Sequence, residues 1–174
     1  MAKRLWINGR ILFGFSRMFW IGLIIVLILL FRSSKATSQP AQALQIPTQV
    51  NDAITQALSG FGLDSNNVRF WIAVSALETD FWTSQVYIEN NNLFGMRLPS
   101  SNTTATFSQF GFAGFDSLED SATDLTLYFD RLKWNQVNYP TLAALVAQMK
   151  SKNYFEESAD EYLMAVSEKY SMLF

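Results

Sequence analysis

Residues 70–97 have the sequence FWIAVSALETDFWTSQVYIENNNLFGMR, and the rest of the chain is organised around this stretch. Its first half is apolar on nearly every side of a helix, which is typical of a helix buried in a core. Asp64 or Ser65 is predicted to cap this helix, because their side-chain oxygens accept the free N–H groups of a first turn. The apolar run ends at Glu78, so we expect its carboxylate at the edge of the core, in the wall of a cleft.

The expected position of Glu78 predicts a raised pKa. Burial near Trp71, Phe81 or Trp82 disfavours the charged carboxylate, and the negative end of the helix dipole raises the pKa further. A carboxyl group that stays protonated near neutral pH is what general-acid cleavage of a glycosidic bond requires. The position of Glu78 alone also fits a solvated carboxylate at a helix end, so the choice between the two interpretations depends on the neighbouring residues.

Two motifs surround Glu78 in the sequence. ALETD at residues 76–80 is followed by Ser84, and NLFGMR occupies residues 92–97. In this order and spacing, the motifs resemble the glucosaminidase family of peptidoglycan hydrolases, which are flagellar-rod-type and autolysin-type enzymes with a lysozyme-like fold. The resemblance implies that Glu78 is the catalytic acid and that the turn at residues 92–95 lines the cleft.

The resemblance continues more weakly toward the C-terminus. FDSLEDS at residues 115–121, followed by Asp124, is similar to the family's segment after its hairpin. Asn153-Tyr154 and the DEY at residues 160–162 are similar to its last motif, although the proline of that motif is absent. Coverage is about residues 50–172, with gaps. The substrate-binding residues that the resemblance implies are Asn92, Phe94, Gly95 and Tyr154.

One departure from the family concerns the second carboxylate. Many members carry an acidic residue on the β-hairpin, but this chain has no Asp or Glu between Met96 and Phe115. The usual pair of carboxylates therefore cannot be built from the hairpin. One alternative is a single-acid route, in which the N-acetyl or hydroxyl group of the substrate assists, as in lytic transglycosylases and substrate-assisted glycosidases. The other is a relocated acid, for which the candidates are Glu119 and Glu89, and also Asp80 and Asp116.

The composition excludes several kinds of chemistry. The chain holds no Cys and no His, so disulfides, thiol nucleophiles, Ser-His-Asp catalysis and His-ligated zinc are excluded. We expect neither a metal nor a cofactor. After residue 35 the chain has seven basic and fifteen acidic residues, and seven minus fifteen gives a net charge near −8. This charge argues against a nucleic-acid partner and fits a largely uncharged glycan.

The N-terminal residues predict a membrane anchor. Residues 11–31 are apolar or glycine except for Ser16 and Arg17, and they are long enough to span a bilayer if Arg17 extends to the interface. Four basic residues precede the core of this segment and two follow it, so residues 1–10 are predicted in the cytoplasm and the domain outside. The alternative is a signal peptide that is cleaved after Ala36.

The remaining residues predict a linker and one domain. Residues 32–47 are polar with two prolines and are interpreted as a flexible linker. Residues 48–174 suffice for one domain with a single core. Within it, residues 103–115 combine β-branched and aromatic residues with two glycines, which predicts a small hairpin. The predicted fold class is mainly α: a lysozyme-like α+β domain with a small β-hairpin, preceded by a single N-terminal transmembrane helix.

Helix starts are predicted from capping residues elsewhere in the domain. Thr48 is expected to cap a first helix that runs to about residue 59 and is stopped by Gly60 or Gly62, and residues 84–89 are expected to form a short helix. Ser117 and Ser158 are predicted to cap two later helices. Pro140 is predicted to start the helix between them.

The sequence predicts a membrane-anchored hydrolase that cleaves the glycan strand of peptidoglycan with Glu78 as general acid. It fits an endo-β-N-acetylglucosaminidase or a lytic transglycosylase for cell-wall lysis or remodelling, at a bacterial inner membrane facing the periplasm or in a phage virion membrane. The alternative is a binding or structural virion-membrane module that keeps the lysozyme-like fold with weak or no turnover. The cleaved bond, the choice between hydrolysis and transglycosylation, and the oligomeric state stay open.

Overall fold

The structure of the chain is a computed structural model that divides it into two compact units. The first unit is Met1–Gln42 and the second is Ala43–Phe174. The structure describes residues 6–7, 10–11, 44–134 and 136–174.

In the first unit, two short strands pair with each other. Strand β1 (Trp6–Ile7) is antiparallel to β2 (Arg10–Ile11), with Trp6 opposite Ile11. The predicted membrane span begins at Ile11, but its residues 12–31 lie outside the described part of the chain. Among the helices that the structure does describe, none combines the length and the apolar character needed to cross a bilayer.

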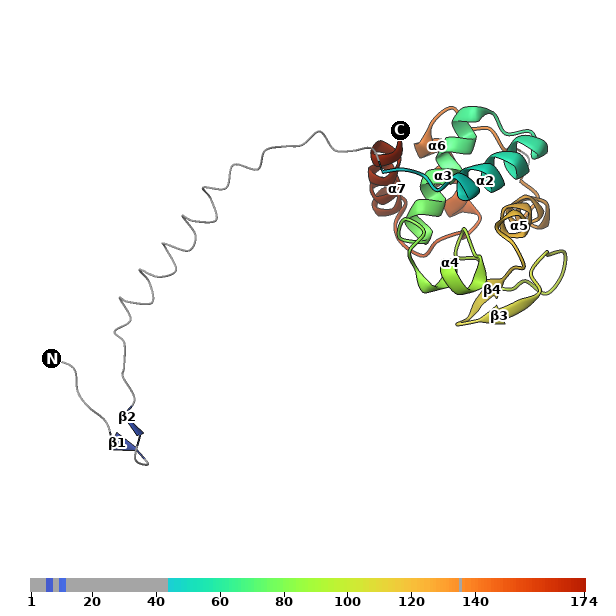
Figure 1. Ribbon diagram of the computed structural model, residues 1–174. Helices are drawn as coiled ribbons and strands as arrows, with labels where there is room; N and C mark the ends of the chain where they lie inside the picture. Colours follow the sequence, from blue (N-terminus) through green and yellow to red (C-terminus); the bar gives the residue numbers. More distant parts are fainter. Residues whose placement is uncertain (1–5, 8–9, 12–43, 135) are drawn as a thin grey trace. The chain divides into compact units, whose positions relative to one another are not determined.

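The second unit is mainly helical with one two-stranded hairpin, as predicted (Figure 1). Helix α3 packs against α2 and α7, α2 packs against α5, α6 against α7, and α4 against β4. The elements in chain order are α2 (Thr48–Phe61), α3 (Ser65–Glu78), α4 (Gln85–Asn90), β3 (Phe107–Gln109), β4 (Phe112–Gly114), α5 (Leu118–Arg131), α6 (Leu142–Ser151) and α7 (Ala159–Leu173).

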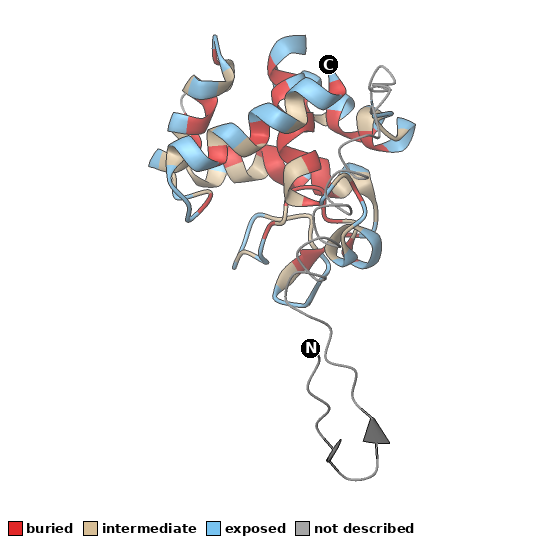
Figure 2. Ribbon diagram, turned by 90° about the vertical axis from the view of Figure 1, so that its left-hand side faces the viewer, coloured by how far each residue is buried: buried red, intermediate tan, exposed pale blue. Residues whose placement is uncertain are grey.

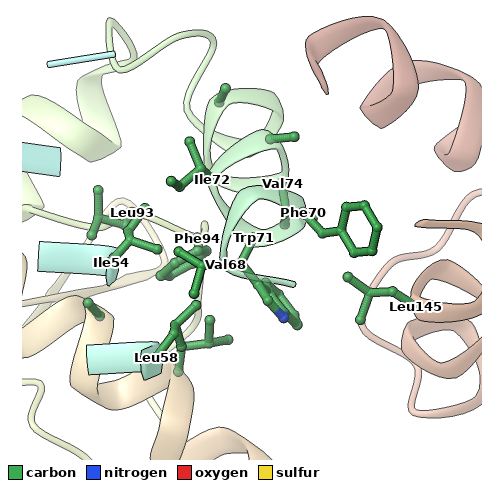
Figure 3. Close-up of a cluster of buried hydrophobic side chains, with 14 of the residues drawn as sticks. Ile54, Leu58, Val68, Phe70, Trp71, Ile72, Val74, Leu93, Phe94 and Leu145 are labelled. Atoms are coloured by element: carbon green, nitrogen blue, oxygen red, sulfur yellow. The ribbon is translucent and has the colours of Figure 1, made fainter. Parts of the chain in front are cut away.

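Helix α3 is the centre of the core. The Asp64 carboxylate accepts a hydrogen bond of 2.8 Å from the backbone N–H of Asn67. Of the two predicted candidates, Asp64 and Ser65, it is therefore Asp64 that caps the helix. Every residue of α3 from Phe70 to Ala76 is buried. Figure 3 shows Phe70 directed toward the side of Leu145 and Val68 toward the side of Leu58. The prediction of a helix buried on nearly every side is confirmed.

The buried residues are concentrated on the inner faces of the helices, while the outer faces are exposed (Figure 2). Trp71, at 0% exposure, is in the middle of an aromatic cluster. Its ring centroid lies 5.3 Å from that of Phe129, 5.9 Å from Tyr154 and 6.0 Å from Phe94. Because these rings come from α5 and from two loops, Trp71 ties the cleft-forming segments to the central helix.

Two of the later predicted caps are confirmed. The Ser117 hydroxyl accepts from the backbone N–H of Asp120 at 3.1 Å, and α5 begins at the next residue. Ser158 accepts from the N–H of Glu161 at 3.2 Å, while the Glu161 carboxylate accepts in return from the backbone of Ser158. This reciprocal capping box fixes the start of α7.

Two predicted helix starts are wrong by one or two residues. Pro47 is at the N-cap of α2, and Thr48 is its first helical residue without a side-chain cap. Helix α6 is capped by Thr141 instead of being started by Pro140, because the Thr141 hydroxyl accepts from the N–H of Ala144 at 3.1 Å. Proline has no side-chain acceptor and cannot satisfy such a group.

The hairpin and the end of the linker also have clear positions. Strands β3 and β4 lie within the predicted residues 103–115, and Phe107 pairs with Gly114 across the ladder. The backbone N–H of Leu44 donates a 3.3 Å hydrogen bond to the carbonyl of Met172 in α7. The last residues of the predicted linker 32–47 are therefore attached to the domain.

Candidate active site

The backbone that carries Glu78 is fixed by an abrupt end of α3. Thr79 is fully buried, and its hydroxyl donates to the carbonyl of Ser75 at 2.6 Å and accepts from the N–H of Trp82 at 3.0 Å. Asp80, Phe81 and Trp82 all have positive φ values, of 48°, 54° and 61°. Three successive non-glycine residues in this region turn the chain sharply away from the helix. Glu78, the last residue of α3, is thereby left at the edge of the core.

The Glu78 carboxyl is held by a tyrosine from the other end of the domain. The Tyr162 hydroxyl in α7 donates a 2.6 Å hydrogen bond to Oε1 of Glu78. Burial raises the pKa of the Glu78 carboxyl, as predicted from the sequence, and the negative charge of Glu157 raises it further. The hydrogen bond from Tyr162 favours the charged form and offsets only part of this rise, so the net direction of the pKa is upward.

The second carboxyl oxygen of Glu78 faces Gly95. A Cβ atom placed on Gly95 would lie 3.2 Å from Oε2, and the φ of Gly95 is +61°, a conformation that glycine adopts without strain. Glycine therefore serves two purposes here: it permits the turn and places no side chain against Oε2. Since Oε1 already accepts from Tyr162, Oε2 is the oxygen that is available to carry and deliver a proton.

Asn92 builds the turn beside Glu78 from inside the protein. Its side chain is 0% exposed and donates to the carbonyls of Met96 at 2.8 Å and Ala113 at 2.9 Å. Its Oδ1 accepts from the N–H groups of Phe94 at 3.2 Å and Met96 at 3.1 Å. Both donors and both lone pairs of the amide are used. Of the implied substrate-binding residues, Asn92 thus has no polar atom left for a sugar.

Phe94 and Tyr154 connect the turn to the aromatic cluster. The Phe94 side chain is 2% exposed and meets Trp71 edge-on, at an interplanar angle of 84°. The Tyr154 hydroxyl donates to the Phe94 carbonyl at 3.2 Å. Burial, together with the charge of Glu78, holds the pKa of Tyr154 well above its usual value, so this hydroxyl remains a donor. Phe94 therefore contributes backbone to the cleft wall, while its ring belongs to the core.

The cleft consists of two hollows that meet at Glu78. The first hollow has a volume of about 460 Å³ and includes Phe94, Gly95, Phe112 and Arg131 in its walls. The second has a volume of about 520 Å³ and includes Leu77, Glu157, Glu161 and Tyr162. The residues common to both are Glu78, Arg97, Tyr154, Phe155 and Glu156. A chain-like substrate that extends from one hollow into the other passes over the Glu78 carboxyl.

Comparison with known proteins agrees with this geometry. The family Glucosaminidase, described as mannosyl-glycoprotein endo-beta-N-acetylglucosaminidase, matches residues 54–171. The chain belongs to the glucosaminidase family. The resemblance seen in the sequence motifs is confirmed, and the protein is a glycoside hydrolase that acts on peptidoglycan. No curated protein matches the chain.

A solved structure shares the fold of this glucosaminidase domain. It is described as "Structure of a type VI secretion system effector-immunity complex from Pseudomonas protegens". The match has a TM-score of 0.50 and 18% sequence identity, and it covers 71% of this chain and 95% of that chain. At this identity the likeness concerns the fold alone.

The candidate second carboxylates do not reach the cleft of the glucosaminidase domain. Glu89 is exposed on α4, where it accepts from Gln85 at 2.8 Å and from Gln109 at 3.0 Å. Glu119 is exposed in the first turn of α5, a position that the helix dipole favours for a carboxylate. Neither lines a hollow, and neither do the other two candidates, Asp80 and Asp116. In the part of the chain that the structure describes, no cluster of acidic residues is suited to a metal ion.

Several cleft residues were missed by sequence reasoning. Tyr162 ends the DEY motif at residues 160–162, but it was not among the predicted site residues. Nothing in the sequence indicates that this hydroxyl meets Glu78, which lies 84 positions earlier. Glu156 follows Tyr154 closely and lines both hollows. The signal for Glu156 was its nearness to the Asn153-Tyr154 motif.

The FDSLEDS motif and Asp124 turn out to support the cleft wall. The Ser121 hydroxyl accepts from the N–H of Leu93 at 2.9 Å, which attaches the turn to α5. Asp124 is fully buried, accepts from Thr103 at 2.5 Å, and forms an ion pair of 3.1 Å with Arg131. Arg131 is thereby directed into the first hollow of the glucosaminidase domain.

Proposed function

We propose that the protein cleaves the glycan strand of peptidoglycan by general-acid catalysis, with Glu78 as the acid. The observation that carries this proposal is the position of one carboxyl group at the junction of two hollows. Its Oε1 accepts a hydrogen bond from Tyr162, its Oε2 lies beside Gly95, which has no side chain, and burial raises the pKa of the carboxyl group. These are the properties that a proton donor to a leaving-group oxygen needs.

The bond-breaking step follows from this arrangement. Oε2 of Glu78 gives its proton to the glycosidic oxygen while the bond from that oxygen to the anomeric carbon breaks. The sugar on the other side takes up positive charge, and Glu78 becomes a carboxylate. The hydrogen bond from Tyr162 then stabilises the new negative charge, since it favours the charged form of Glu78.

Two routes remain for the second half of the reaction. In one, a group of the substrate attacks the cationic carbon. A hydroxyl group that attacks gives its proton to the Glu78 carboxylate and closes an anhydro ring, as in a lytic transglycosylase, whereas an N-acetyl oxygen that attacks forms a cyclic ion that water then opens, with one proton of the water returning to Glu78. In the other, a relocated carboxylate activates water. Glu156 is the best placed for that role, because it is exposed and lines both hollows together with Glu78.

The proposal extends to the location of the domain. Residues 11–31 anchor the chain in a membrane, residues 1–10 stay inside, and residues 48–174 face the cell wall, beyond the linker of residues 32–47. The asymmetry of basic residues around the apolar segment supports this orientation. Protease added to intact cells should remove the domain and spare an N-terminal tag. Full protection of the domain would reverse the topology, and a mature N-terminus at Thr37 would replace the anchor with a signal peptide.

The substitution Glu78→Gln tests the catalytic assignment. It keeps the shape of the side chain and removes the proton, so lysis of purified cell wall should fall by at least about 100-fold. Binding to wall material should persist. Glu89→Gln is the matched control, because Glu89 lies outside both hollows, and its lysis rate should stay within about twofold of the parent.

Three outcomes of this experiment distinguish the possible mechanisms. Loss of lysis in Glu78→Gln alone, with Glu156→Gln active, supports the single-acid route. Equal loss in Glu78→Gln and Glu156→Gln supports a relocated second carboxylate. If the parent binds wall material without releasing any fragments, and Glu78→Gln binds equally well, the general-acid proposal is refuted and the chain acts as a binding module.

A further inference from the structure

Arg97 is a basic side chain in the cleft without an internal partner. It is exposed, and together with Glu78 it belongs to the residues that line both hollows. Among the residues that the structure describes, its guanidinium forms no ion pair and no side-chain hydrogen bond. Arg131, the other arginine of the cleft, is already bound to Asp124 at 3.1 Å. Arg97 therefore has its five donors available to a ligand.

The charges of the two hollows differ. Among the residues that the structure describes, the first hollow contains Arg97, Arg131 and, besides Glu78, the carboxylate of Glu156. The described residues around the second hollow include Arg97 and Glu156 as well, but Glu157 and Glu161 add two carboxylates there. Since Asp124 already compensates the charge of Arg131, it is this excess of carboxylates that makes an anionic group of a substrate less favourable in the second hollow than in the first.

The alternating strand of peptidoglycan offers a matching difference. Every second sugar carries a lactyl group that ends in a carboxylate or in its peptide amide, while the sugars between are neutral. A guanidinium binds a carboxylate through two parallel hydrogen bonds, which a neutral amide cannot reproduce with the same strength. An arginine at the junction would therefore distinguish the two kinds of sugar by charge.

We propose that Arg97 is a specificity-determining residue that binds the lactyl carboxylate of a muramyl sugar seated in the first hollow. This inference rests on the proposed function, because it assumes that a glycan strand occupies the cleft. The acidic second hollow then holds the neutral sugar on the other side of the bond that is cleaved. The charge difference sets the direction in which the strand lies, and it favours strands whose lactyl groups are free of peptide.

Binding measurements on the full 174-residue chain test the inference without turnover. The parent for this experiment carries Glu78→Gln, so that ligands are not consumed. The probes are a peptide-free peptidoglycan glycan oligomer with free lactyl carboxylates and the same oligomer with each carboxylate converted to a methyl amide. Calorimetry should show about fivefold tighter binding of the free acid, the amount expected for one partly solvated ion pair.

Arg97→Gln in the same parent should abolish this preference while leaving the affinity for the methyl amide within about twofold. Arg69→Gln is the matched control: Arg69 is exposed on α3 and lies against the Phe174 ring, outside both hollows. It should keep the fivefold preference. Arg97→Lys, which retains the charge without the fork of donors, should keep part of it.

Other results would overturn the inference. Equal affinity of the parent for both oligomers, no measurable binding of the free acid, or equal effects of Arg97→Gln and Arg69→Gln would each do so. The outcome is separable from the proposed function. If the chain binds the free acid selectively but never cleaves it, the catalytic role is refuted and the specificity of Arg97 stands. If the enzyme cleaves both oligomers equally in both arginine variants, the catalytic role stands and the specificity of Arg97 is refuted.

Discussion

The turn at Asn92–Gly95 and the outer strand of the hairpin, β3, are built in opposite ways. Residues 92–94 of the turn are buried, and the Asn92 side chain alone makes four hydrogen bonds. All three residues of β3 are exposed, and Gln109 contributes one side-chain hydrogen bond, to Glu89. The inner strand β4 is attached to the turn, because the Asn92 side chain donates to the carbonyl of Ala113 at 2.9 Å.

This difference shows where positional precision is needed. Glu78 can act as an acid only if Oε2 is held in place, and the turn at Gly95 lies directly against that oxygen. Strand β3 carries no carboxylate and lines neither hollow. We therefore expect stability and activity to depend strongly on the turn and weakly on β3.

The largest effect is expected for Asn92→Ala. The substitution leaves the buried N–H groups of Phe94 and Met96 without an acceptor, and each unsatisfied group costs about 1–3 kcal/mol. The carbonyls of Met96 and Ala113 lose one of their two donors each but keep the N–H of Ala113 and the Asn90 amide. The free energy of unfolding should fall by about 3 kcal/mol, measured by urea denaturation. Gln109→Ala on β3 is the control and should change it by less than about 0.5 kcal/mol. Similar losses of stability in both variants would remove the contrast between the turn and β3.

Gly95→Ala should separate activity from stability. A Cβ at φ +61° costs about 1–2 kcal/mol of stability, and its approach to 3.2 Å from Oε2 of Glu78 should displace the oxygen that we propose as the proton donor. Lysis of cell wall should fall at least about tenfold in protein that is fully folded by circular dichroism. Gly60→Ala is the control, since Gly60 lies in α2 with no atom near its missing Cβ. Full activity in Gly95→Ala would show that the turn does not constrain Oε2.

Tyr162→Phe tests how Oε1 is held. The ring is retained and can still stack on Phe155, 3.9 Å away, but the hydrogen bond to Glu78 is lost. Activity at the pH optimum should fall roughly tenfold. Because that hydrogen bond favours the carboxylate, its loss raises the pKa of Glu78 further, and the alkaline limb of the pH–rate profile should move to higher pH. Tyr170→Phe, on the same helix, should leave the profile unchanged, and an identical shift in both variants would contradict the assignment.

The smallest effect concerns stability as a function of pH. Burial raises the pKa of Glu78 in the folded state above its unfolded value of 4.5. The folded state therefore binds this proton more tightly, and the associated stability is present below pH 4.5 and is lost as the pH rises through the folded pKa. Glu78→Gln cannot ionise, so its free energy of unfolding should exceed that of the parent at pH 7, and this gain should vanish near pH 4. Parallel curves for the two proteins would contradict a raised pKa.

Local patterns predicted the helices and the hairpin well. Capping residues such as Asp64, Ser117 and Ser158 act on the next few N–H groups, so their effect is visible in a short window of sequence. The same reasoning failed at Pro140 because Thr141, one residue later, offers a hydroxyl acceptor. Local reasoning could not place Glu89 and Glu119, which lie outside both hollows, because a carboxylate on a helix gives no local sign of whether its face meets solvent or a cleft.

The sequence by itself determined the buried central helix, the acid at its end, the glycine-containing turn and the family to which they belong. These depend on residues close together in the chain, where spacing translates directly into geometry. Only the tertiary structure decided that Tyr162 holds Glu78, that the Asn92 amide is fully bonded inside the turn, and that Arg97 lines both hollows without an ion pair to any described residue. Such contacts join distant segments through the packing of α3 against α7 and of the turn against β4, and no local periodicity encodes them.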